Sequence, residues 1–331
     1  MDAYMDFPNF CSYLNSMSNQ DFYECNKILL GSCNLHFSFD KSEMNKTKKV
    51  TRSNFEIWLR GATTNRQGWC NEWGCAFPQR PVEIDKVPNE NFTAEQLTSI
   101  YMLDGEGVKD WAEKGNLLVA PVGEELNVIK KLQIDGEFRP STPFLIYRMN
   151  DWSTVEKNCA PCTDIIIVDR FIFAQSDWEY ESNSYALLKS LCRWAKNTPI
   201  NIVIFTQDNY PDGHQNIRIP LETIKRNLKE LLGREIGVEP NVTFVIISRV
   251  DKHDRKILTN YKMYESGDSF KYFKNGGLSS HGDCLNIHSL YDKRNHEVAW
   301  EIIESLQNIV NEKKKGLGLI LGNQKSLFLN F

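Results

Sequence analysis

Three short apolar segments in the second half of the chain constrain its fold more than any other feature. They are Asp164–Phe173, Ile200–Thr206 and Val242–Ser248, and each is nearly continuous in apolar residues. Such runs are typical of strands that are buried on both faces of a sheet. Two segments with helical spacing, Asn183–Lys196 and Pro220–Leu232, separate the runs. Because strands that alternate with helices form right-handed parallel crossovers, these segments predict an α/β domain.

The residues that follow extend this domain. We expect two more strands at Lys256–Tyr264 and Cys284–Leu290, and a final helix at Asn295–Val310. Together with the three apolar segments, they predict a mixed, largely parallel sheet with flanking helices over residues 163–310.

The last part of the chain, residues 311–331, forms a tail. It ends in the run Leu327–Phe331, which is too apolar to stay in water without a groove or a partner. We expect the tail to pair with an edge strand, either in this chain or in a protein partner such as a second copy.

The first half, residues 1–150, is patterned less regularly. Its segment 61–88 is rich in Gly, Pro, Trp and Cys and has no sustained period, which indicates an irregular excursion. The short elements expected here are helices at Asp21–Leu30, Ala94–Met102 and Gly107–Lys114 and strands at Leu35–Phe39, Asn54–Leu59, Leu117–Val122 and Phe144–Met149. We predict a loop-rich α+β domain of unknown type, so that the chain is α+β overall, with a boundary within residues 150–162.

The composition indicates a folded protein without a dominant charge. Of 331 residues, 41% are hydrophobic and 25% are charged, which is ordinary for globular domains. The formal net charge of -4 excludes a global positive field, so nucleic acid or a phospholipid headgroup would have to meet a local patch. The start of the chain is acidic, unlike a signal peptide, and no apolar run has the length of a membrane span. We therefore expect a cytoplasmic protein.

The nine cysteines are most simply interpreted as reduced thiols that pack as small hydrophobic groups. Two pairs have a spacing that suits metal ligands, Cys70 with Cys75 and Cys159 with Cys162. Together these residues could supply four thiolates to one zinc ion. Structural or redox roles also fit the two pairs, and no other cofactor is expected.

The sharpest local pattern begins where the apolar segment Val242–Ser248 ends. There the chain enters a polar turn, in which His253 is followed by Arg255 and, five positions further on, by Asn260. The carboxyl ends of strands are where open α/β sheets bind ligands. This segment is therefore the candidate chemical centre of the chain.

The spacing of these residues resembles the signature of the phospholipase D superfamily, in which His-x-Lys is followed after four residues by Asp. The resemblance implies that His253 attacks phosphorus, that Arg255 holds the phosphate oxygens and that Asn260 orients the imidazole. Arginine suits its role because it binds phosphate through two parallel hydrogen bonds. Asn260 suits its role poorly, because an amide cannot stabilise an imidazolium as a carboxylate does. Efficient turnover is therefore not expected.

A longer stretch, Thr163–Val310, is similar to the phospholipase D-like domain that follows MIT domains in some eukaryotic membrane-remodelling proteins. The similar pieces are Ile165–Ile172, His253–Ile257 and Tyr264–Phe273, whereas no MIT helical hairpin is evident upstream. The resemblance implies a domain that binds lipid headgroups and dimerises without phosphodiesterase activity. The candidate ligand-binding residues are Asp169, Arg170, Lys252, Lys256, His214 and Ser269.

Plainer interpretations of the same residues stay open. His253 can be a surface-turn histidine that pairs with a neighbouring acid, and Arg255 can form a salt bridge to Asp169. Cleavage of a phosphodiester also needs a group that protonates the leaving group. Either His214 or the His253 of a second copy would have to supply it.

Three functions are compatible with the sequence. The first is a degenerate phospholipase D-like module that binds a phosphate-bearing ligand or a protein partner, as a dimer and without efficient turnover. The second is a phosphodiesterase or nuclease that uses His253 in a homodimeric site. The third is an interaction protein that acts through its first half, where Trp58, Trp69 and Trp73 could also stack on nucleic acid bases or pack a core. Asn260 favours the first function over the second.

Overall fold

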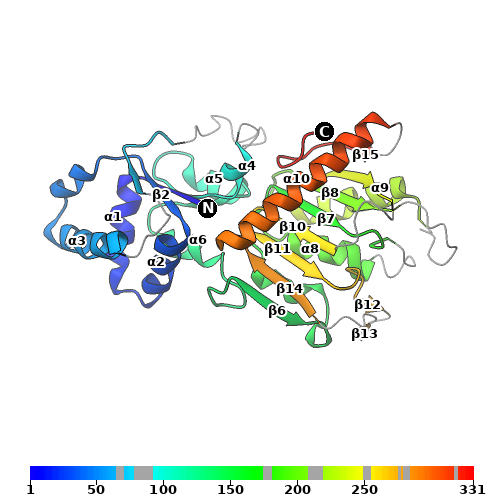
Figure 1. The fold of residues 1–331 in the computed structure, drawn as a ribbon, viewed down its shortest axis with the longest axis horizontal. Coiled ribbons are helices and arrows are strands. Elements are labelled where there is room, and N and C mark those ends of the chain that lie inside the picture. Colours follow the sequence, from blue (N-terminus) through cyan, green and yellow to red (C-terminus); the bar gives the residue numbers. More distant parts are fainter. Residues whose placement is uncertain are drawn as a thin grey trace.

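The computed structural model describes residues 1–64, 71–77, 92–173, 181–207, 219–248, 255–274, 277–278, 284–316 and 320–331. Each half of the chain contributes a β-sheet with accompanying helices, and the two halves lie side by side (Figure 1). The predicted α/β fold class is confirmed.

The first sheet consists of five parallel strands in the order β3-β2-β1-β4-β5. They are β1 (Asp2–Met5), β2 (Asn34–Phe37), β3 (Asn71–Trp73), β4 (Ile100–Met102) and β5 (Leu118–Ala120). This half is more regular than the loop-rich domain predicted for it. Strands of three or four residues offer too few positions for a period to be visible in the sequence.

Helices follow each of the strands β1, β2, β3, β4 and β5 along the chain. They are α1 (Phe7–Asn15), η1 (Ser16–Ser18), α2 (Gln20–Ser32), η2 (Lys41–Lys46), α3 (Lys49–Thr64), α4 (Ala94–Leu97), α5 (Val108–Lys114) and α6 (Glu125–Lys130). The elements α2, β2, α5 and β5 confirm four of the predictions made for this half.

Two other predictions for the first half are wrong. Asn54–Leu59 is not a strand but part of α3, whose buried residues Thr51, Phe55, Trp58 and Ala62 recur every three or four positions. The apolar alternation that suggested a strand includes Ile57, which is 58% exposed. The expected helix Ala94–Met102 ends at Leu97, and its last three residues form β4 instead.

The second sheet is mixed and has eight strands in the order β15-β9-β8-β7-β10-β11-β14-β6. The three apolar segments form its parallel part as β7 (Asp164–Val168), β8 (Asn201–Thr206) and β9 (Asn241–Ile246). The antiparallel strands are β10 (Arg255–Leu258), β11 (Lys262–Ser266), β14 (Cys284–Ser289), β6 (Ser141–Leu145) and β15 (Ile320–Gly322). A separate small hairpin consists of β12 (Phe273–Lys274) and β13 (Gly277–Leu278).

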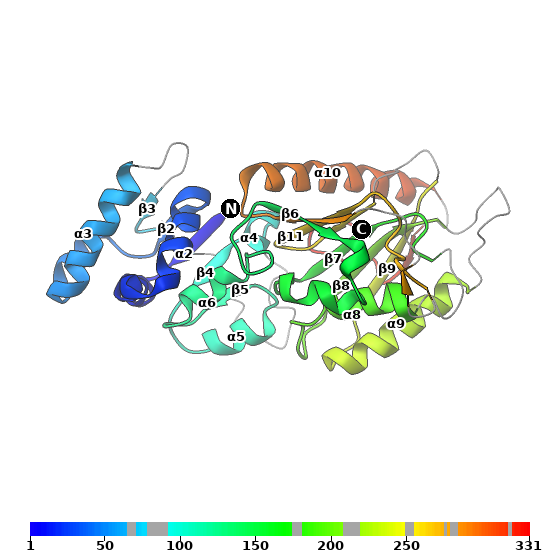
Figure 2. The same ribbon diagram turned by 90° about the horizontal axis from the view of Figure 1, so that it is seen from below.

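Helices cover both faces of the second sheet (Figure 2). One face is covered by α10 (Lys293–Lys315), and the other by α8 (Ala186–Leu191) and α9 (Leu221–Ile236). Shorter helical turns are η3 (Ile146–Arg148), η4 (Trp152–Asn158) and η5 (Glu181–Tyr185). In β7, Ile166 and Val168 belong to the core beneath α10, whereas Ile165 and Ile167 belong to the core beneath α8 and α9. The continuous apolar runs thus fill two cores at once.

The second sheet draws on residues at both ends of the domain. Its strand β6 lies within residues 1–150 and pairs with β14. The tail lies on its own chain, because β15 pairs with β9 and the side chain of Leu329 is buried. In the same tail, the Ser326 hydroxyl and the Leu327 backbone N–H donate to the buried carboxylate of Asp164, at 2.6 and 2.9 Å.

A buried turn between β10 and β11 joins the two halves. The Tyr261 hydroxyl donates to the backbone carbonyl of Ser99 at 2.9 Å and accepts from the N–H of Leu118 at 3.0 Å, next to the strands β4 and β5. The Tyr261 ring itself packs in the core of the first half. The expected strand Lys256–Tyr264 is accordingly interrupted here.

Candidate functional site

The carboxyl end of β7 carries a buried carboxylate. Asp169 accepts hydrogen bonds from the backbone N–H groups of Phe171 and Phe270 and from the hydroxyl of Ser269, at 2.7 to 2.9 Å. Burial raises the pKa of Asp169, while these donors and the positive charge of Arg255 oppose the shift. Asp169 and Ser269, both candidates from the sequence, are thus brought together, and their hydrogen bond fixes the loop after β11 to the end of β7.

Two guanidinium groups lie against one aromatic ring at this strand end. The Cζ atoms of Arg170 and Arg255 are 5.0 and 6.0 Å from the centroid of the Phe171 ring. Buried Arg170 donates to the Oε1 atom of Gln207, the residue that follows β8, at 3.2 Å from Nε and 2.9 Å from Nη2. Half-buried Arg255 donates to the carbonyl of Gly267 at 2.9 Å. The carboxyl end of β7 and the amino end of β10 therefore bring two guanidinium groups to one ring.

Arg255 has no ion pair within the part of the chain that the structure describes. The salt bridge to Asp169 that the sequence allowed is therefore not formed, and the two groups attract each other at longer range. The next residue differs, because Lys256 forms an ion pair with Glu265 at 2.7 Å. Hydrogen bonds from His288 and Lys256 lower the pKa of Glu265 to about 2. The charge of Lys256 is thus neutralised, whereas no described residue forms an ion pair with Arg255.

Asn260 lies at the other end of the sheet. It is fully buried, and its Oδ1 accepts from the N–H of Thr163 at 2.9 Å while its Nδ2 donates to the carbonyl of Leu97 at 2.8 Å. Because β10 runs antiparallel to β7, Arg255 lies near the carboxyl end of β7 and Asn260 near its amino end. At about 3.3 Å per strand residue, the separation is roughly 15 Å. The structure does not bring Arg255 and Asn260 into one site.

Several predicted residues lie outside the described residues. They are the candidate nucleophile His253, the ligand-binding candidates Lys252 and His214, and also Cys70 and Trp69. The described part of the site at the strand ends consists of four predicted residues, Asp169, Arg170, Arg255 and Ser269. It also contains Phe171 and Gln207, which sequence reasoning missed.

Three of the four cysteines proposed as one zinc site are described by the structure, and these three do not gather. Cys159 and Cys162 are buried in the core of the second half. The Cys159 thiol contacts the carbonyl of Val155 at 3.4 Å, and burial raises its pKa to about 11, which keeps it protonated. Cys75 instead lies beside the first sheet, where its N–H donates to the carbonyl of Phe37 and its thiol lies near the carboxylate of Glu72.

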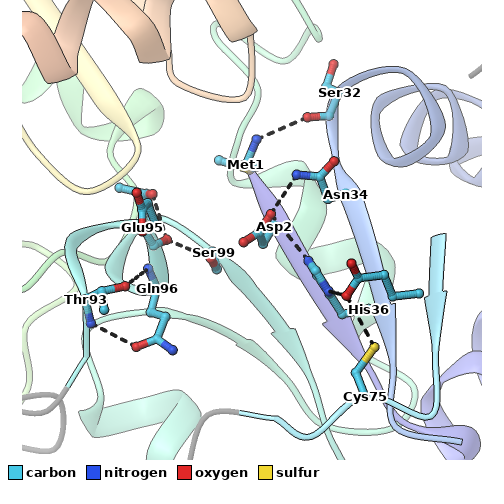
Figure 3. A network of polar contacts seen from close by, with 12 residues as sticks. Met1, Asp2, Ser32, Asn34, His36, Cys75, Thr93, Glu95, Gln96 and Ser99 are labelled. Atoms are coloured by element: carbon cyan, nitrogen blue, oxygen red, sulfur yellow. Dashed lines mark hydrogen bonds and ion pairs between the residues drawn. The ribbon is translucent and has the colours of Figure 1, made fainter. Parts of the chain in front are cut away.

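A second polar cluster lies on the first sheet, and Figure 3 shows it together with its surroundings. His36 of β2 has its Nδ1 atom 3.1 Å from a carboxylate oxygen of Glu72 in β3 and its Nε2 atom 3.5 Å from a carboxylate oxygen of Asp2 in β1. The Cys75 thiol lies 3.7 Å from the same Glu72 oxygen. The nearby carboxylate of Asp2 raises the pKa of His36, and burial opposes the shift.

The three side chains of His36, Glu72 and Cys75 could hold a metal ion, because their ligand atoms all lie within 4.8 Å of one another. Sequence reasoning missed this group, since His36 is more than thirty residues away from Glu72 and Cys75 and meets them only through strand pairing. The one visible signal was the spacing from Glu72 to Cys75.

Trp58 and Trp73, the two candidate tryptophans that the structure describes, do not form a surface for stacking bases. Trp58 is buried, and its indole N–H donates to Asn26 at 3.0 Å. Trp73 stacks on Phe37 with ring centroids 4.1 Å apart. Both residues belong to the packing of the first half, which is the second of the two roles considered for them.

No known protein family and no curated protein matches this chain. Among solved structures it is similar to TrmBL2, described as an archaeal chromatin protein with a novel mode of DNA binding. The alignment covers 58% of this chain and 59% of that one, with 12% sequence identity and a TM-score of 0.28.

Among the helices that the structure describes, none combines the length and apolar character needed to cross a membrane.

Proposed function

We propose that this protein is a degenerate phospholipase D-like module that binds a phosphate-bearing ligand at the ends of β7, β8 and β10 without efficient turnover. The observation that carries the proposal is the pair of guanidinium groups of Arg170 and Arg255 on the Phe171 ring, with Arg255 lacking an ion pair among the described residues. Arginine is the side chain best suited to bind phosphate oxygens, since its N–H donors match their geometry.

The position of the two arginines supports a ligand site. Ligands of open α/β sheets bind beyond the carboxyl ends of parallel strands. Arg170 is the second residue after β7, and Gln207 is the first residue after the neighbouring parallel strand β8. The two hydrogen bonds from Arg170 to Gln207 fix one guanidinium plane before a ligand arrives. A fixed donor loses less conformational entropy when a ligand binds.

The contacts of Asn260 argue against turnover. In the resemblance to phospholipase D, this residue would orient the histidine, yet both ends of its amide are used in buried hydrogen bonds to Thr163 and Leu97. A histidine without an orienting carboxylate loses several orders of magnitude in rate in comparable triads. Binding is therefore the function that the described residues support, and homodimerisation stays a prediction.

The proposal is tested by measuring binding of inorganic phosphate, a mononucleotide, single-stranded DNA and vesicles with anionic phospholipids to the wild type, Arg255→Gln and Arg234→Gln. Arg234 is a control, because it is an exposed arginine of α9 that is already paired with Glu230. We expect Arg255→Gln to weaken binding about tenfold, the effect of one charged hydrogen bond, and Arg234→Gln to leave it unchanged. Wild-type protein that binds none of the four probes would refute the proposal.

A second measurement addresses turnover. The same proteins and a His253→Ala variant are incubated with a generic phosphodiester, and we expect no cleavage by any of them. Cleavage by the wild type that is lost in His253→Ala would establish a phosphodiesterase and overturn the proposal of a module without turnover.

A further inference from the structure

We infer that His36, Glu72 and Cys75 form a binding site for a divalent transition metal ion, with Zn²⁺ as the favoured ion and Asp2 as the residue that orients the histidine. This site is separate from the phosphate site proposed above, because it lies on the first sheet. It also differs from the four-cysteine site that the sequence suggested.

The backbone places the three ligands together. β2 and β3 are parallel neighbours in which His36 lies directly opposite Glu72. After β3, the N–H of Cys75 donates to the carbonyl of Phe37 at 2.9 Å, so this segment stays beside the end of β2. The turn is made by Gly74, whose φ of 73° is in the left-handed region that favours glycine. Cys75 therefore returns to the side of Glu72.

The distances suit a tetrahedral ion. The Oε2 atom of Glu72 lies 3.1 Å from the Nδ1 atom of His36 and 3.7 Å from the sulfur of Cys75. Zinc bonds of about 2.0 Å to nitrogen or oxygen and about 2.3 Å to sulfur separate neighbouring ligands by roughly 3.3 to 3.6 Å in a tetrahedron. The Glu72 oxygen thus needs shifts of only a few tenths of an ångström. The Nδ1 atom of His36 and the sulfur of Cys75, which lie within 4.8 Å of each other, would approach by at most about 1.3 Å to reach the tetrahedral separation.

The orientation of the imidazole is that of a metal ligand. Its Nε2 atom faces the Asp2 carboxylate at 3.5 Å, and Asp2 is itself held by the side-chain amide of Asn34 at 3.0 Å. The ring also stacks on Tyr4, with centroids 4.8 Å apart. A histidine that binds a metal generally donates its other N–H to a carboxylate, which fixes the ring and makes the free nitrogen more basic. Asp2 is placed to do this for His36.

The net charge of the cluster and its exposure to solvent both suit a bound cation. Two carboxylates and one thiol surround a single imidazole, so the cluster stays negative even when His36 is protonated. A divalent ion bound to a thiolate would balance this charge in place of the proton. The Glu72 side chain is 57% exposed, whereas that of His36 is 15% exposed, so one side of the cluster is open to solvent. Nitrogen, sulfur and carboxylate ligands together favour zinc over magnesium or calcium, and three protein ligands leave a fourth position for water.

The experiment uses Co²⁺ and Zn²⁺ with the full-length protein after removal of metal by a chelator. We expect one equivalent of Co²⁺ to give a thiolate-to-cobalt charge-transfer band and the visible bands of tetrahedral cobalt, and Zn²⁺ to displace it. Cys75→Ser should abolish the charge-transfer band. Glu72→Gln and Asp2→Asn should keep the band but weaken Zn²⁺ binding about 10-fold to 100-fold in titration calorimetry.

A matched control is His288→Gln, because His288 also lies beside a carboxylate, Glu265, at 3.0 Å, but no cysteine in the described part of the chain forms a metal-ligand group with it. This variant should bind metal as the wild type does. Circular dichroism of each metal-free variant shows whether it folds. The inference is overturned if the wild type shows no saturable binding, or if the charge-transfer band persists in folded Cys75→Ser, since another thiol would then be the ligand.

Discussion

Lys262, in β11, is a fully buried charge that no carboxylate neutralises among the described residues. Its ammonium donates to the carbonyls of Leu132 and Gln133 at 2.6 and 2.8 Å and to the hydroxyl of Ser289 at 3.3 Å. Burial lowers the pKa of Lys262 to about 7. The unfolded chain, in which a lysine has a pKa of about 10.4, therefore binds more protons between pH 7 and pH 10. In this window the contribution of Lys262 to stability increases with pH.

We predict that the free energy of unfolding of the wild type, minus that of Lys262→Met, increases by about 2 kcal/mol between pH 7.5 and pH 9.5. Urea denaturation at several pH values measures both proteins, and the subtraction removes the contribution of other titrating groups. A difference that is independent of pH would show that Lys262 keeps an ordinary pKa in the folded protein.

At Asn260, a single atom decides between a structural and a catalytic role. Asn260→Asp would restore the carboxylate of the phospholipase D signature, but it would remove the donor to Leu97 and bury a charge. We predict a loss of about 2 to 4 kcal/mol in the free energy of unfolding and no gain in phosphodiester cleavage. Asn311→Asp, an exposed change on α10, is the control and should be nearly neutral. Increased cleavage by Asn260→Asp would instead assign the residue to catalysis.

At the scale of elements, the sequence predicts well where an element is long or completely apolar. β7, β8 and β9 are recognisable because both faces of each strand are buried, and α9 because Leu221, Ile224, Leu228 and Leu232 share one face. In the first sheet, β2 and β5 were predicted as strands, but β4 was assigned to a helix, since it has three residues that are buried at every position. The candidate site residues follow the same rule. Asp169 and Arg170 could be predicted because they follow an apolar run. The pairing of His36 with Glu72 could not, because it depends on a strand register that no local sequence pattern indicates.

The tail is an element whose role can be tested by removal. Deleting residues 324–331 takes two donors from the buried carboxylate of Asp164 and removes the buried side chain of Leu329. We predict a loss of about 3 to 5 kcal/mol in the free energy of unfolding, measured by urea denaturation. Lys325→Ala, an exposed change in the same segment, should have no effect. If the deletion left stability unchanged, the tail would be available to a protein partner instead.

At the scale of the whole molecule, one buried turn supplies polar contacts between the two halves, while Tyr291, Leu327 and Phe328 add apolar contacts. Asn260 and Tyr261 contact Leu97, Ser99 and Leu118 of the first half. The Lys262 ammonium also donates to the carbonyls of Leu132 and Gln133, which follow α6 where the chain passes from one sheet to the other. Because all three residues are fully buried, neither half can unfold without exposing polar groups of the other. The halves should therefore unfold as one cooperative unit in the wild type.

Tyr261→Phe tests this coupling with the loss of one oxygen atom. The variant leaves the buried N–H of Leu118 without its acceptor and the carbonyl of Ser99 without its donor, which costs about 1 to 3 kcal/mol. We predict that amide hydrogen exchange in β4 and β5 becomes about 10-fold to 100-fold faster, while exchange in β8 changes less. Tyr147→Phe, which alters a tyrosine that is 66% exposed, should leave both regions unchanged. An equal increase in β8 would mean that the variant weakens global stability without separating the halves, and no increase in β4 and β5 would mean that Tyr261 does not couple them.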